Sequence, residues 1–140
     1  MDLPLTRRVA SRVEVLAHAG STNAELRWRA DDSHAWPHLS VLLTDDQTAG
    51  RGRLDRSWTA PAGASLAVSV LLRSLPSDVG SRGWIPLAAG VAMADAISRQ
   101  LPDHDVSVKW PNDVLVDGRK ICGILAEATP DAVIVGTGVN

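Results

Sequence analysis

The chain has 140 residues, of which 45% are hydrophobic, and a formal net charge of -2. This length and apolar content fit one domain with a single core. The slightly acidic balance argues against the broad positive field of a dedicated nucleic-acid-binding protein. One cysteine, Cys122, excludes an internal disulfide and a cysteine-based zinc cluster, which fits a reducing compartment.

Neither a targeting segment nor a membrane span is evident in the sequence. Two arginines occur in the first ten residues, MDLPLTRRVA, but no apolar run follows them. The longest apolar stretch, Ile85 to Ile97, is too short and too interrupted to cross a bilayer. We therefore expect a cytoplasmic protein that binds neither nucleic acid nor a membrane.

The first part of the chain predicts two strands with a helix between them. Arg12 to Ala17 is expected to form a short strand, and Leu39 to Thr44 a buried one. A helix is predicted to begin at Thr22 and to end near Ala30. Thr22 and Glu25 have the T-x-x-E spacing of a capping box, in which each side chain satisfies the other residue's backbone N-H.

The stretch QTAGRGRLDRSW, which begins at Gln47, has the composition of an anion-binding loop. Gly50 and Gly52 remove side chains where backbone N-H groups would approach a ligand closely. Fork-shaped donors that match carboxylate or phosphate oxygens come from Arg51, Arg53 and Arg56. Flexible basic surface loops and non-specific nucleic-acid contacts also contain such sequences, so other segments must decide the function.

The next strand is predicted by alternation. Ser65 to Arg73 places large apolar residues on one face, which we expect to be the buried one, and small residues on the other. The apolar set is Leu66, Val68, Val70 and Leu72, and the small set is Ser65, Ala67 and Ser69.

A long core helix is predicted from Trp84 to Leu101, with Pro86 in its first turn. Four strands follow, over Val106 to Trp110, Val114 to Val116, Ile121 to Ala128 and Ala132 to Val139, with a hairpin turn at Asp117-Gly118. The expected fold class is α+β, a mixed, largely antiparallel sheet with helices packed on one face.

Four motifs now bear on function: S-T-N at Ser21, the G-R-G-R-x-x-R-x-W loop, K-W-P-N-D from Lys109, and K-x-x-G-I-L-x-E from Lys120 to Glu127. In this order and spacing they resemble the catalytic domain of biotin protein ligases (biotin-[acetyl-CoA-carboxylase] ligases). The resemblance covers nearly the whole chain from Val13 onward. It implies a class II aminoacyl-tRNA synthetase/biotin ligase-like fold.

The resemblance also implies a two-step reaction. Biotin and ATP, the latter with Mg²⁺, give biotinyl-5'-adenylate and pyrophosphate, and the adenylate then acylates a lysine of a biotin carboxyl carrier domain. Residues 1-140 are expected to be only the N-terminal portion of the catalytic domain, with no winged helix-turn-helix and no C-terminal β-barrel.

Site residues follow from the same resemblance. It implies catalytic roles for Lys109 and Arg53, ATP contacts for Arg51, Asn112 and Asn140, and no metal site of the protein's own. The biotin-binding set that it implies is Ser21, Thr22, Asn23, Gln47, Gly50, Arg51, Gly52, Arg53, Trp58, Lys109, Gly123 and Leu125.

Simpler roles stay open for several of these residues. Thr22 fits a plain helix cap, Gln47 a solvated loop side chain, and Lys109 a strand-end lysine in water. Trp58 and Leu125 are compatible with ordinary core packing.

Other positions are left with alternatives or depart from the family pattern. Asn112 and Asp113 are expected to hold either the backbone or a Mg²⁺-bound phosphate. Cys122 is expected to be a small buried hydrophobe, because no histidine lies nearby in the motif. Asp55 stands where the family usually has glycine, which makes the loop less permissive and partly offsets its charge.

Two alternative functions remain. A lipoate or octanoate ligase or transferase would share the fold and a comparable lysine. A non-catalytic, truncated biotin-binding fragment would share the ligand but not the turnover. A nucleic-acid-binding loop is disfavoured by the acidic net charge.

Overall fold

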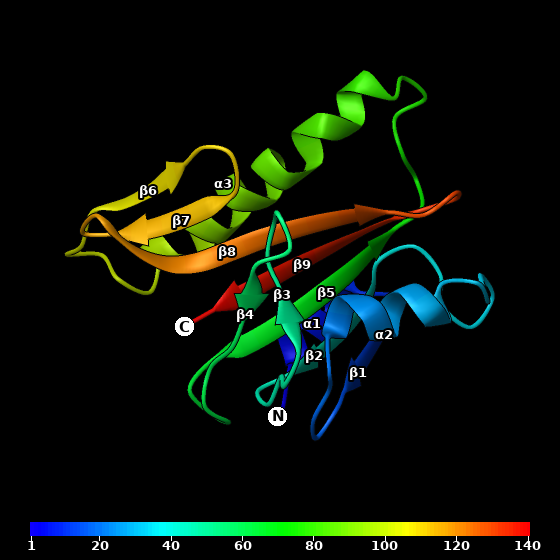
Figure 1. Cartoon of the computed structure of the whole chain (residues 1–140), viewed down its shortest axis with the longest axis horizontal. Coiled ribbons are helices and arrows are strands. Elements are labelled where there is room, and N and C mark those ends of the chain that lie inside the picture. The colour runs from blue at the N-terminus through cyan, green and yellow to red at the C-terminus, as the bar shows by residue number, and fades with distance from the viewer.

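The computed structural model describes residues 1-140, which form a seven-stranded sheet, a small two-stranded sheet and a few helices (Figure 1). The helices are α1 (Pro4–Val9), α2 (Thr22–Arg29), the 3-10 helix η1 (Gly80–Trp84) and α3 (Ile85–Ser98). The strands are β1 (Arg12–Val15), β2 (Ser40–Thr44), β3 (Gly50–Arg51), β4 (Ser57–Trp58), β5 (Leu66–Leu72), β6 (Val106–Lys109), β7 (Asp113–Val116), β8 (Arg119–Ala128) and β9 (Val133–Val139).

The large sheet has the strand order β1-β2-β5-β9-β8-β7-β6. All of its neighbouring strands are antiparallel except β1 and β2, which run parallel. The predicted mixed, largely antiparallel α+β fold is therefore confirmed. Asp117 and Gly118 form the predicted turn between β7 and β8, both with positive φ, as a two-residue hairpin requires.

The helices do not share one face of the sheet, so that part of the prediction is wrong. Ile134 of β9 packs in one core cluster with Leu26 of α2, whereas its neighbours Val133 and Val135 pack in a second cluster with Ile97 of α3. Successive residues of a strand point to opposite faces. It follows that α2 covers one face of the sheet and α3 the other. The prediction failed because apolar periodicity identifies the buried face of a helix but not the side of the sheet on which the helix packs.

The predicted orientation of β5 is also reversed. Its alternation is present, but the face with the smaller side chains is the more deeply buried one. The buried residues are Ala67, Ser69 and Leu71, and the half-buried ones are Leu66, Val68, Val70 and Leu72. The small side chains lie on the α2 face, as Leu71 packs in the α2 cluster while Leu72 packs with the α3 cluster.

The start of α2 differs from the predicted capping box. Ser21 is the N-cap, with an extended backbone, and its Oγ accepts a 3.4 Å hydrogen bond from the Ala24 N-H. Thr22 is the first helical residue, and Glu25 pairs with Arg29 instead of reaching back to the cap. The Thr22 hydroxyl is thereby released from capping.

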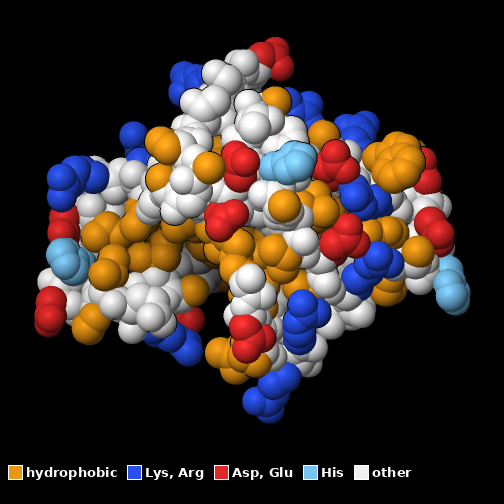
Figure 2. Space-filling model, turned by 90° about the horizontal axis from the view of Figure 1, so that it is seen from below, with side chains coloured by type: hydrophobic (Ala, Val, Ile, Leu, Met, Phe, Trp, Pro, Cys, Tyr) orange, Lys and Arg blue, Asp and Glu red, His pale blue; other side chains and the backbone are white.

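Charged side chains of both signs surround hydrophobic side chains that gather across the middle of one face of the molecule (Figure 2). No broad single-sign field is visible on this face, as the net charge of -2 suggests. None of the helices is both long enough and apolar enough to cross a membrane.

Cys122 is fully buried in the α3-side cluster, as predicted for a small hydrophobe. Burial disfavours the thiolate and raises the pKa of Cys122 to about 11.

We predict negligible alkylation of the native protein by iodoacetamide at about pH 8 and rapid alkylation in denaturant, read by intact mass. Since the folded-state pKa is raised, the contribution of this thiol to stability is constant at neutral pH and declines above about pH 9. Fast alkylation under native conditions would contradict the buried assignment.

Candidate functional site

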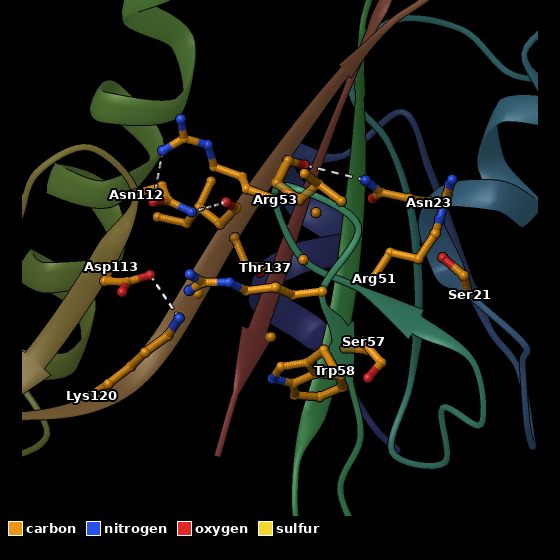
Figure 3. Close-up of a pocket in the computed structure, with 18 of the residues that line it drawn as sticks. Ser21, Asn23, Arg51, Arg53, Ser57, Trp58, Asn112, Asp113, Lys120 and Thr137 are labelled. Atoms are coloured by element: carbon orange, nitrogen blue, oxygen red, sulfur yellow. Dashed lines mark hydrogen bonds and ion pairs between the residues drawn. The ribbon is translucent and has the colours of Figure 1, made fainter.

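A cleft of about 380 Å³ lies on the α2 face of the sheet (Figure 3). Its walls come from the start of α2, the Gly-Arg loop that carries β3 and β4, the turn between β6 and β7, and the middle of β8 and β9. This volume is within the range of small-molecule sites. Segments far apart in the sequence therefore meet around one cavity.

The cleft brings together most of the residues predicted for the site. Those that line it are Ser21, Thr22, Asn23, Gln47, Arg51, Gly52, Arg53, Trp58, Lys109, Asn112, Gly123 and Leu125. Gly50 lies behind the wall, and a Cβ built there would come within 2.6 Å of the Trp58 carbonyl oxygen, so only glycine fits. Asn140 is exposed outside the cleft, where its backbone N-H donates to the Ile121 carbonyl at 2.9 Å.

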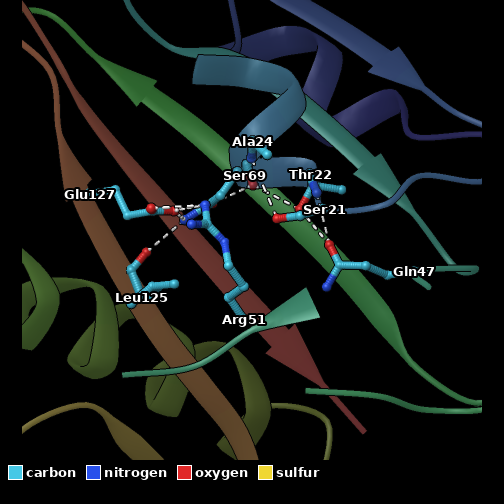
Figure 4. Close-up of polar contacts among 9 residues, drawn as sticks. Ser21, Thr22, Ala24, Gln47, Arg51, Ser69, Leu125 and Glu127 are labelled. Atoms are coloured by element: carbon cyan, nitrogen blue, oxygen red, sulfur yellow. Dashed lines mark hydrogen bonds and ion pairs between the residues drawn. The ribbon is translucent and has the colours of Figure 1, made fainter. Parts of the chain in front are cut away.

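One end of the cleft is a hydrogen-bonded polar cluster (Figure 4). The backbone N-H and the hydroxyl of Thr22 both donate to Gln47 Oε1, at 2.8 and 3.1 Å. The Ser69 hydroxyl lies 2.9 Å from Thr22 Oγ1 and 2.6 Å from Asn23 Oδ1, so its single proton serves one of the two acceptors. These bonds to Oε1 fix the orientation of the Gln47 amide, and its Nε2 group remains as a hydrogen-bond donor.

Asn23 is tied to protein partners on both sides of its amide. Its Nδ2 donates to the Leu125 carbonyl at 3.2 Å and to Glu127 Oε2 at 2.8 Å. A Cβ on Gly136 of β9 would lie 2.3 Å from Asn23 Oδ1, so this glycine allows α2 to approach the sheet. Because both amide hydrogens are in use, Asn23 builds the wall, and the hydroxyl proton of the neighbouring Ser21, whose oxygen caps α2, remains available to a ligand.

The opposite end of the cleft is cationic. Lys120 Nζ forms a 2.7 Å ion pair with Asp113 Oδ1 and lies over Gly123, 3.2 Å from where a Cβ there would be. Lys109, at the end of β6, is exposed and lines the same end. Two ammonium groups against one carboxylate leave a net positive charge there.

Asn112 connects the Gly-Arg loop to the sheet. Its Nδ2 donates to the Ile124 carbonyl at 2.8 Å, and its Oδ1 accepts a 3.3 Å hydrogen bond from Arg53 Nη1. The Trp110-Pro111 peptide bond that precedes it is cis. Of the alternatives predicted for Asn112, contact with the backbone is the one that this geometry shows.

The Gly-Arg loop carries a lid-like aromatic and a tightly turned tip. The Trp58 ring lies against Gly138 of β9, 2.8 Å from where a Cβ there would be, so it lines the cleft rather than the core. At the tip, Leu54 and Asp55 both have left-handed backbones, with φ of 55° and 57°. Aspartate tolerates this region better than most residues, so Asp55 fits a backbone conformation that would also suit glycine.

Sequence reasoning did not assign roles to several residues in the cleft or directly behind its lining. Lys120 and Glu127 are the two ends of the K-x-x-G-I-L-x-E motif, and that position was a usable signal. Ser69 and Gly136 carried no signal of their own, because their contacts depend on strand register: Ser69 lies opposite Gly136 in the β5-β9 pair. No group of three or more histidine, cysteine, aspartate or glutamate side chains is arranged to hold a metal ion.

Comparison with known proteins identifies the family. The Biotin/lipoate A/B protein ligase family matches residues 16–140. The biotin-[acetyl-CoA-carboxylase] ligase of Mycobacterium tuberculosis is 44% identical over 131 residues, which cover 92% of this chain and 49% of that protein. The bifunctional ligase/repressor BirA of Escherichia coli is 36% identical over 133 residues, covering 91% of this chain and 40% of that protein.

Solved structures agree with this assignment. Biotin protein ligase from Leishmania major, in complex with biotinyl-5-AMP, superimposes with a TM-score of 0.80 at 27% identity and covers 93% of this chain and 57% of that one. The biotin protein ligase from Aquifex aeolicus in complex with biotin and ATP gives 0.76 at 31% identity, over 93% and 52%. The chain belongs to the Biotin/lipoate A/B protein ligase family, and its fold is that of biotin protein ligases. It spans about half the length of the curated relatives that it matches.

Ser69 offers a direct test of the polar cluster. Ser69→Ala removes the donor to buried Asn23 Oδ1, and an unsatisfied buried acceptor costs about 1–3 kcal/mol. We expect a loss of that size in urea unfolding. Ser40→Ala is the matched control, because Ser40 is equally buried but bonds to Pro37 away from the cleft. An equal loss of stability in both variants would refute a specific role for Ser69.

Proposed function

We propose that this chain is the N-terminal portion of a biotin protein ligase catalytic domain. In this proposal it binds biotin and ATP, forms biotinyl-5'-adenylate and passes biotin to a lysine of a biotin carboxyl carrier domain. The observation that carries the proposal is one cleft with a neutral hydrogen-bonding end and a cationic end. Biotin has the same polarity, with a ureido ring at one end and a carboxylate at the other.

The polar end supplies groups that suit a ureido ring. Ser21, Thr22 and the Nε2 end of Gln47 are positioned at the start of α2 and offer both donors and acceptors. In this proposal Asn23 holds the wall, through its bonds to Leu125 and Ser69. The apolar part of the ligand lies along the floor of β8 and β9, under the Trp58 ring.

The cationic end supplies electrostatic stabilisation. The biotin carboxylate and the ATP phosphates repel one another, and a cation about 4 Å from such an oxygen interacts at roughly 4 kcal/mol for an effective dielectric near 20. Lys109 and Lys120 are placed to offset that repulsion. ATP enters as its Mg²⁺ complex, and Asn112 and Arg53 lie together on the same side of the cleft.

The chemistry then follows in two balanced steps. A biotin carboxylate oxygen attacks the α-phosphorus of ATP, and the bond to pyrophosphate breaks. The amine of the acceptor lysine next attacks the acyl carbon, a proton is lost from that amine, and AMP leaves. Lys109 stabilises the negative charge that develops in the first step, and Arg53 helps to cover the adenylate until the acceptor arrives.

We also propose a cytoplasmic location, supported by the single buried thiol of Cys122. Nucleic acid is not among the proposed partners, since the arginines of the Gly-Arg loop line the cleft and the net charge is -2.

Ligand identity is tested by calorimetry with biotin, lipoate and ATP. Biotin is expected to bind, with only a mild loss of affinity between about 50 and about 200 mM salt, because one carboxylate releases few counterions. Lipoate lacks the ureido ring and would leave the polar cluster of Thr22 and Gln47 unmatched. Preferential binding of lipoate would favour the lipoate ligase alternative. Tight binding of DNA with a steep salt slope, and no heat with biotin, would overturn the proposal.

Lys109 is predicted to serve adenylation and not the fold. Its side chain is exposed, so Lys109→Ala should change the free energy of unfolding by no more than about 0.5 kcal/mol. Removing one preorganised electrostatic donor typically costs about 10²–10³ in rate. Lys109→Arg should also be impaired, because a guanidinium does not reproduce the compact ammonium.

The readouts for Lys109 are pyrophosphate release with biotin and ATP, and a melting curve. Arg99→Ala is the control, since Arg99 is an exposed cation on α3 that pairs with Asp95 outside the cleft. Pyrophosphate release that survives Lys109→Ala, or a loss that only follows unfolding, would show that the assignment is wrong.

A further inference from the structure

Glu127, near the end of β8, is an acidic residue that contacts two lining residues of the cleft, Arg51 and Asn23, and that the proposed chemistry does not use. Its side chain is only 17% exposed. Its two oxygens lie 2.9 and 3.2 Å from Arg51 Nη2, and Oε2 also accepts the 2.8 Å hydrogen bond from Asn23 (Figure 4). A carboxylate so far withdrawn from water needs hydrogen-bond donors of this kind to replace its lost hydration.

This single carboxylate joins three separate segments. Arg51 belongs to β3 of the Gly-Arg loop, Asn23 belongs to the start of α2, and Glu127 belongs to the central sheet. The two contacts span 76 and 104 residues of sequence. Glu127 therefore sets the position of the loop relative to the polar end of the cleft.

The first residues of the Gly-Arg loop are anchored, because Gln47 accepts from Thr22 and the N-H groups of Thr48 and Ala49 donate to the carbonyls of Ala19 and Gly20. From Gly50 onward the loop has few attachments apart from the Trp58 ring on Gly138. Its own hairpin consists of two residue pairs, Gly50 with Trp58 and Arg51 with Ser57, and it is not hydrogen-bonded into the large sheet. The side-chain ties from the loop to β8 and the β6-β7 turn are the ion pair of Arg51 with Glu127 and the longer Arg53 to Asn112 bond. Of these two ties, only the first is a bond between opposite charges.

We propose that Glu127 is a positioning residue that holds the Gly-Arg loop closed over the cleft through Arg51, and that it also orients Asn23. The proposal rests on the proposed function only for its kinetic consequence, which is slow release of ligand. It also assigns Arg51 chiefly to closing the loop. Anion contact at the other end of the cleft then falls to the lysines and Arg53.

Two substitutions at Glu127 separate its two contacts. Glu127→Gln keeps an oxygen for Asn23 but removes the charge that binds Arg51. Amide hydrogen exchange in the loop from Gly52 to Trp58, without ligand, is expected to accelerate by about three- to fivefold, since the pair is partly exposed. Release of bound biotin should accelerate similarly, with its association rate unchanged. Glu127→Ala also frees Asn23 and should weaken biotin binding by about tenfold.

Controls identify the cause of these effects. Glu14→Gln makes the same change in a Glu-Arg pair on β1, outside the cleft, and should leave loop exchange and biotin release unchanged. Arg51→Met alone should reproduce Glu127→Gln, and the double variant should be no faster than either single one.

The possible outcomes are distinguishable. Unchanged loop exchange in Glu127→Gln, or additive effects in the double variant, would overturn the inference whatever the ligand. Accelerated exchange in a protein that does not bind biotin would support the closing role and reject the proposed function. Melting curves provide the last check, because a fall in melting temperature that accounts for the faster exchange would show a merely structural role.

Discussion

The contact between the start of α2 and the sheet is the constraint on which the rest of the site depends. Asn23 lies so close to Gly136 that no side chain fits there, and Ser69 and Glu127 bind its amide from either side. This contact fixes where the first helical turn lies over β5, β9 and β8. Once that turn is placed, the hydroxyl of Thr22 faces the cleft, and Gln47 is held by it. Packing and ligand recognition thus share the same atoms.

Much of the fold was predictable from local pattern. The strands from β5 to β9 and the Asp117-Gly118 turn follow from alternation and turn chemistry, because these depend on neighbouring residues alone. The face of the sheet on which each helix packs could not be predicted in this way. Nothing in the sequence of α2 or α3 indicates which side of a strand such as β9 the helix covers. The reversed burial of β5 has the same origin. The small residues Ala67 and Ser69 are typical of a solvent-facing side, but in the structure the helix α2 packs over them and buries them.

The site divides in the same way. Motif residues such as Lys109 and Thr22 were predictable, because short segments carry them and the resemblance names them. The supporting residues were not: Ser69 reaches Asn23 across 46 positions and Glu127 reaches Arg51 across 76. Asn140, predicted from its motif, lies outside the cleft as the last residue. Long-range partners are set by register, which no local pattern encodes.

The strand β8 has a further consequence for how this protein tolerates change. Its residues alternate between two environments: Cys122 and Ile124 belong to the buried cluster under α3, whereas Gly123, Leu125 and Glu127 face the cleft side. One strand thus carries two functions at a period of two residues. Substitutions in the set under α3 alter the core packing, and substitutions in the cleft-facing set alter the ligand site. Substitutions in the set under α3 can therefore change thermal stability without altering the residues that face the cleft.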